Sequence, residues 1–260
     1  MRNLLADIDR LLRGHFTRKQ DLLAGRIGIP ARTLVLSAFL LGAIYGVFMG
    51  IFAVLREQNP STAQLLATII KVPLLFLATL LVTYPSLYVF SALANSALRG
   101  MDTLRLLVAS ITVNLALLAS FGPIIGFFTL STSSYPFLVV LNVIFFAISG
   151  VTGVVFLRRA LGHLFVAESD GAAETRSGPP ASAAEAPPPL PSTSLQQRQA
   201  AENGRRVFRI WMITYALVGA QMAWILRPFI GVPEQAFTFF RQRDSNFFEG
   251  LWHALRSLFG

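Results

Sequence analysis

Five long apolar blocks constrain this chain more than any other feature. Each has roughly the 20 residues that an α-helix needs to cross a hydrocarbon layer of about 30 Å, with almost no charge inside it. The blocks lie at residues 33–55, 71–93, 104–130, 137–157 and 207–226. A bilayer offers no water to exposed backbone groups, so an apolar block crosses it as a helix. We therefore expect an all-α, polytopic transmembrane helix bundle with five spans.

The overall composition agrees with a membrane protein and narrows its chemistry. Of the 260 residues, 54% are apolar and only 13% are charged. The net charge of +9 is concentrated beside the spans, where basic residues orient a membrane protein and attract anionic head groups, so we do not expect nucleic-acid binding. The chain has no cysteine, which excludes disulfides and cysteine metal sites.

Lysine and arginine predict the orientation of the spans. Segments 1–32, 94–103 and 158–206 contain most of the basic residues, whereas the loop at 131–135 contains none. The positive-inside rule then predicts a cytoplasmic N-terminus and a C-terminus on the opposite side. Arginine-rich composition suggests the inner membrane of a bacterium. Four arginines after residue 226, which are Arg227, Arg241, Arg243 and Arg256, oppose this orientation for the fifth span.

The regions outside the blocks are of two main kinds. Residues 1–32 and 229–260 each contain apolar residues at helical spacing, and Asn246 and Glu249 form a capping-box pair before the second amphipathic stretch. Either stretch would lie in the head-group plane or pack on the bundle. Residues 166–205 are rich in Pro, Ala and Ser, which predicts a disordered cytoplasmic linker between the four-helix region 33–165 and the fifth helix at 206–228.

Small residues at intervals of four form a stripe on the first span. The stripe consists of Ala38, Gly42, Gly46 and Gly50. Missing side chains let another helix backbone approach closely. The partner is either another helix of this chain, which we favour, or a second copy of the chain in a homo-oligomer. Phe48 is expected on the opposite face, where packing matters less.

Chemistry-bearing residues are scarce inside the five blocks. We find no Asp, Glu or His there, so we expect no catalytic, cofactor-binding or metal site. Asn142 and Gln221 lie at a similar depth of roughly 20 Å and are predicted to bond between the fourth and fifth helices. Pro85 and Pro123 are expected to kink the second and third helices, a feature of some transporters.

The second block also carries a family resemblance. Its sequence, "KVPLLFLATLLVTYPSLYVFSAL", together with five spans and a cytoplasmic N-terminal region, resembles the Yip1-like membrane proteins and their bacterial relatives. The resemblance implies a five-pass topology, and its eukaryotic members imply a scaffold for small GTPases in membrane trafficking. No residue set in this chain matches such a partner site.

Two functional hypotheses follow. The first is a non-enzymatic integral membrane scaffold or accessory protein with protein partners in the membrane and no cofactor. The alternative is a transporter for a small molecule or lipid. An enzyme is a third, less favoured class. A transporter needs a polar, water-accessible cavity near the midplane, whereas a scaffold is packed through its centre.

Overall fold

The computed structural model describes residues 9, 30–93, 100–174, 192–231, 235–240 and 246–259. Within these ranges the regular structure is entirely helical, as expected. The helices are α3 (Ala31–Leu55), α4 (Thr62–Leu93), α5 (Gly100–Ser131), α6 (Tyr135–Glu174), α7 (Ser192–Leu226) and α8 (Phe247–Phe259). The first five of these are long and apolar enough to cross a membrane, which confirms the predicted fold class.

The second span begins earlier than the sequence predicted. α4 starts at Thr62, and its apolar window covers Thr62–Ser86, whereas we placed the boundary at residue 71. The stretch "TAQLLATII" before Lys71 is itself apolar and has no residue that stops a helix. Lys71 therefore lies inside the span and not at its edge.

Helices occupy both ends of the region 166–205, where the sequence predicted a disordered linker. α6 continues to Glu174 and α7 starts at Ser192, so both ends of that region are helical. The stretch "LQQRQAAE" after Ser192 consists of good helix formers, which outweigh the polar composition of the region. Residues 175–191 lie outside the described part of the chain, as does most of the expected amphipathic region 1–32.

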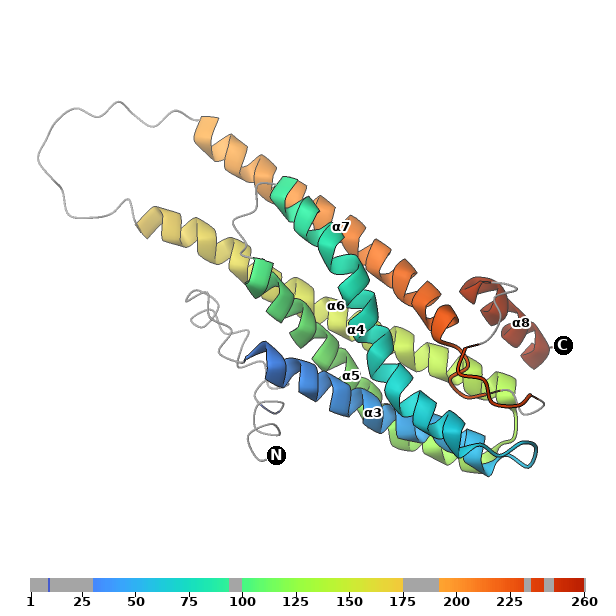
Figure 1. The fold of residues 1–260 in the computed structure, drawn as a ribbon. Helices are drawn as coiled ribbons and strands as arrows, with labels where there is room; N and C mark the ends of the chain where they lie inside the picture. Colours follow the sequence, from blue (N-terminus) through green and yellow to red (C-terminus); the bar gives the residue numbers. More distant parts are fainter. Residues whose placement is uncertain are drawn as a thin grey trace, which may run out of the picture.

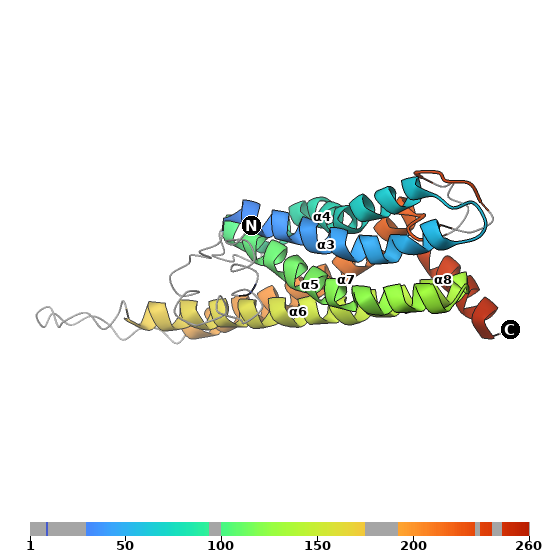
Figure 2. The ribbon, with the colours of Figure 1, turned by 90° about the horizontal axis from the view of Figure 1, so that it is seen from below.

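The spans pack in an order that differs from their order along the chain. α3 packs along both α4 and α5, α7 lies against α4, and α6 lies against α5. In Figure 2, α3 and α4 form one layer, α6 lies in the opposite layer, and α5 lies between them. α8 sits at one end of the bundle and contacts both α6 and α7 (Figure 1). α3 begins at the other end.

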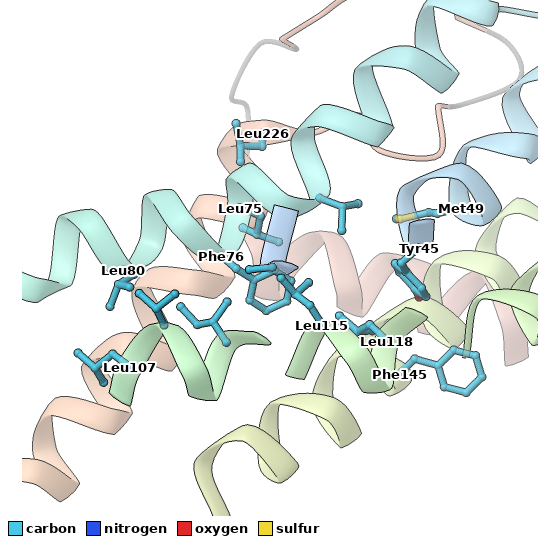
Figure 3. Close-up of a cluster of buried hydrophobic side chains, with 14 of the residues drawn as sticks. Tyr45, Met49, Leu75, Phe76, Leu80, Leu107, Leu115, Leu118, Phe145 and Leu226 are labelled. Atoms are coloured by element: carbon cyan, nitrogen blue, oxygen red, sulfur yellow. The ribbon is translucent and has the colours of Figure 1, made fainter. Parts of the chain in front are cut away.

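The core lies where α3, α4 and α5 meet. Leu115 and Leu118 of α5 have no exposed surface, and Phe145 of α6 and Leu226 of α7 reach the same cluster (Figure 3). Of the five apolar windows, that of α5 is 61% buried and that of α7 only 11%. α7 is therefore a peripheral helix that presents most of its surface to its surroundings.

Candidate functional site

The glycine stripe of α3 lies directly against the backbone of α4. All four of its members, Ala38, Gly42, Gly46 and Gly50, are buried. A Cβ atom on Gly46 would lie 2.8 Å from the Cα of Ile69. One on Gly42 would lie 2.9 Å from the Cβ of Pro73, which sits inside an uninterrupted α4. The partner that the stripe packs against is thus a helix of the same chain.

A second glycine contact joins α3 to α5. Phe48 lies over Gly122 and Gly126, and a Cβ on Gly126 would be 3.0 Å from the ring of Phe48. Phe48 is therefore packed against a neighbouring helix and does not lie on the free face that we expected. Gly122 and Gly126 are four residues apart, a spacing that the sequence displays but that we did not single out.

Asn142 makes a buried bond between helices, and its partner is Tyr45. The hydroxyl of Tyr45 donates to Oδ1 of Asn142 at 2.7 Å, and Nδ2 of Asn142 donates to the carbonyl of Leu138. Both side chains are buried. Gln221 is half-buried on α7, which packs along α4, whereas Asn142 faces α3. The structure therefore joins Asn142 to Tyr45 and not to Gln221.

Lys71 is the only charged residue between positions 62 and 86 of the sequence. It lies nine residues into α4, or about 14 Å along the helix axis, and its side chain is completely buried. Its ammonium group donates to the backbone carbonyl of Pro228 at 3.1 Å and to that of Phe239. Both acceptors belong to the segment that follows α7. A charge at this depth is expensive in a membrane, and such residues are often functional.

Two further side chains of α4 bind the same segment. Gln64, Thr68 and Lys71 have the i, i+4, i+7 spacing that places residues on one face of a helix. Nε2 of Gln64 donates to the carbonyls of Pro228 at 2.9 Å and Phe229 at 2.7 Å. The hydroxyl of Thr68 also bonds to the carbonyl of Phe229. We call these three side chains, with the backbone carbonyls of residues 228, 229 and 239, the polar cap.

Aromatic rings complete the surroundings of the lysine. Nζ of Lys71 lies 4.6 Å from the ring centroid of Phe239 and 5.7 Å from that of Phe240. The faces of these rings carry partial negative charge and attract a cation within about 6 Å. Backbone oxygens and ring faces together stabilise the ammonium group in a position where water is excluded.

Two other basic residues at this end of the bundle also contact backbone oxygens or aromatic rings. Nε of Arg56 donates to the carbonyl of Asn59 at 2.8 Å, and the guanidinium of Arg227 lies 3.7 Å from the ring centroid of Trp224. Gly231 adopts a φ of +78°, and a Cβ there would lie 3.2 Å from Nη1 of Arg56. Arg227, one of the four arginines that oppose the predicted orientation, is thus held against an aromatic ring.

Additional polar side chains bond between the spans. Nε1 of Trp211 donates to the carbonyl of Thr83 at 3.1 Å and connects α7 to α4. The hydroxyl of Ser110 donates to the carbonyl of Gly153 at 2.7 Å and connects α5 to α6. Such bonds are typical of membrane bundles and contribute about 1 kcal/mol each.

The polar cap is the main feature that sequence reasoning missed. We treated Lys71 as the start of a span, so the search for ionisable residues inside the spans passed over it. The nine uncharged residues before Lys71 could have indicated that the span begins earlier. Across the described ranges, no group of three His, Asp or Glu could hold a metal ion. The absence of enzymatic chemistry stays a prediction.

Comparison with known proteins assigns this chain neither a family nor a function. The chain matches no protein-family model, and no curated protein and no solved structure matches it. The resemblance to Yip1-like proteins therefore stays a hypothesis, and function has to be argued from the residues themselves.

Proposed function

We propose that this protein is a non-enzymatic integral membrane scaffold or accessory protein that presents two helical arms to protein partners. The arms are the parts of α6 and α7 that extend beyond the apolar blocks of the sequence. These blocks end at residue 157 in α6 and start at residue 207 in α7, whereas α6 continues to Glu174 and α7 starts at Ser192. The extensions of 17 and 15 residues are about 26 and 22 Å long.

The position of the arms is the observation that carries the proposal. Both project past the rest of the bundle at the same end (Figures 1 and 2). A bundle that needed only to span a bilayer would not require helices of this length. Two helical segments that project beyond the bundle offer surfaces for partner proteins.

Basic residues at the base of the arms support a cytoplasmic location for them. Arg158 and Arg159 of α6 and Arg206 and Arg209 of α7 are all exposed. The positive-inside rule favours the cytoplasm for such a cluster, and anionic head groups of a bacterial inner membrane would bind to it. This orientation agrees with the one that we inferred from the distribution of lysine and arginine.

Site-specific photo-crosslinking in native membranes tests the scaffold proposal. A photoreactive residue at position 164 in the α6 arm or 197 in the α7 arm should give discrete protein adducts. The matched control is position 151, because Val151 is 64% exposed on the part of α6 that lies inside its apolar window. Adducts at 151 alone, or at no position, would contradict the proposal.

A transporter is the second candidate, and the buried Lys71 favours it. Intramembrane ionisable residues commonly mark substrate or ion pathways. Near the middle of α5, Oδ1 of Asn114 is buried and has no hydrogen-bond partner within the described ranges. A polar group of this kind would suit a substrate pathway.

Cysteine labelling separates the two candidates, because the chain has no cysteine of its own. In a scaffold, Asn114→Cys should resist a membrane-impermeant thiol reagent, whereas the exposed Ser131→Cys should react. Labelling of Asn114→Cys from both sides of the membrane would favour the transporter. If neither variant is labelled, the reagent does not reach the end of the bundle. The experiment is then repeated with a longer reagent, and labelling of Asn114→Cys is compared with that of Ser131→Cys.

A further inference from the structure

α8 begins with an N-cap residue and presents one face to the bundle. Oδ1 of Asn246 accepts a hydrogen bond from the backbone N–H of Glu249 at 3.0 Å, which is one of the two bonds of the predicted capping box. Gly250 lies directly against the ring of Trp224 at the end of α7, where a Cβ would overlap the indole. α8 also contacts α6. The helix is therefore docked on the two outermost spans.

A second face of α8 is apolar and open. Phe248 is 54% exposed and Trp252 is 65% exposed, and the two residues are one helical turn apart. A third face is polar, with Glu249, His253 and Arg256 exposed. Three faces of different character are what a helix needs when it touches protein, lipid and water at once.

The location of α8 indicates what covers the apolar face. The helix follows the end of the α7 span and rests on α6 and α7, whose apolar windows are only 22% and 11% buried. If these two helices cross a bilayer, lipid surrounds them, and the open face of α8 borders the same lipid. Tryptophan concentrates at the boundary between lipid and water because its ring is apolar and its indole N–H is polar.

We propose that α8 is an interfacial helix that inserts Phe248 and Trp252 at the boundary between head groups and acyl chains while its opposite side stays on α6 and α7. The exposed Glu249 and Arg256 carry opposite charges, so the insertion does not depend on anionic lipid. This proposal requires that the bundle spans a membrane, but it does not depend on the scaffold function.

Depth-dependent quenching by brominated phospholipids tests the proposal with the full-length protein in proteoliposomes. The bromine atoms are placed either near the head-group end of the acyl chain or near its tip. In the unmodified protein, shallow bromines should quench more emission than deep bromines. Trp252→Phe should lose most of this shallow-quenched component, whether or not the vesicles contain anionic lipid.

Trp211 provides the matched control, since it is 2% exposed and bonded to the carbonyl of Thr83. Trp211→Phe should lower total emission but retain the shallow-quenched component. If Trp252→Phe retains that component, Trp252 does not contact lipid and the proposal fails. It also fails if aqueous iodide quenches Trp252 and brominated lipid does not, which would indicate water or a protein partner at this face.

Discussion

At the scale of single residues, α3 and α4 approach each other closely because the residues of α3 at the contact are glycines, which have no side chain. Gly42, Gly46 and Gly50 each face backbone or Cβ atoms of α4 at distances that leave no room for a methyl group. Side-chain packing, and not a hydrophobic driving force, holds helices together in lipid. A change in volume on this stripe must therefore separate two backbones.

We predict that Gly46→Leu destabilises the protein by about 1–3 kcal/mol or more through overpacking against Ile69. Val47→Leu is the matched control, because Val47 is exposed on the next position of the same helix. Thermal unfolding in detergent, with both variants and the unmodified protein at equal concentration, measures the difference. Equal melting temperatures would mean that α3 and α4 do not approach each other closely.

The lysine of the polar cap gives a second prediction at this scale. Lys71→Met removes the charged donor from the carbonyls of Pro228 and Phe239, of which that of Pro228 keeps its bond from Gln64, and should loosen the segment at 228–240. A hydrogen bond to a charged group contributes about 1.5–3 kcal/mol, so a tenfold or larger increase in cleavage is expected where cleavage follows local opening.

Trypsin added at the C-terminal side of the bundle measures this opening through the arginines at positions 241 and 243. Leu74→Met, at an exposed position of the same helix, should be cleaved at the rate of the unmodified protein. Unchanged cleavage of Lys71→Met would indicate that the cap contributes little to the position of this segment.

At the scale of helices, the sequence predicted the number and type of spans well but not their ends or neighbours. Apolar length alone identified all five helices that could span a membrane. The start of α4 was missed because a lysine normally ends a span, whereas here the distant carbonyls of residues 228 and 239 and the rings of residues 239 and 240 stabilise the buried lysine. The partner of Asn142 was missed because α3, and not α7, is the helix that its side chain faces.

The connection between α6 and α7 gives a prediction at the scale of helices. Residues 175–191 are rich in Pro and Ala, so their composition predicts that protease cuts there before it cuts the spans. Trypsin added at the arm side should cleave first after Arg176. The two fragments should remain associated in detergent, because Trp211 and Leu226 hold α7 against the rest of the bundle.

Gel filtration of the cleaved protein measures that association. The unmodified, uncleaved protein provides the reference elution volume. Resistance of this region to protease would mean that it is folded or bound to a partner. Separation of the fragments would mean that the contact between α4 and α7 is too weak to hold the fifth span.

At the scale of the whole molecule, five helices that all cross a membrane would place the start of α3 and the end of α8 on opposite sides. α3 begins at the end that carries the arms, and α8 lies at the other end. The glycine stripe is occupied by α4, so a homo-oligomer would have to use another surface. Of the five spans, α6 and α7 are the least buried and so are the candidates for such a contact.

Reporter fusions test the orientation directly. A reporter that is active only in the cytoplasm should be active when it is inserted after residue 180 and inactive when it is fused after Gly260. The two fusions act as controls for each other, since each uses the same reporter in the same chain. Activity in the same compartment would show that α7 does not span the membrane.

The polar cap also has a consequence for how the chain is made. Lys71 and its acceptor on Pro228 are 157 residues apart, so the lysine leaves the ribosome long before the carbonyls that bind it are synthesised. A chain that stops before residue 228 would carry the lysine in its second helix without these oxygens or the rings of Phe239 and Phe240. In such a truncated product the lysine would lack these acceptors, and a charge without them is costly in lipid. The second span therefore depends on a segment that is synthesised after the fifth.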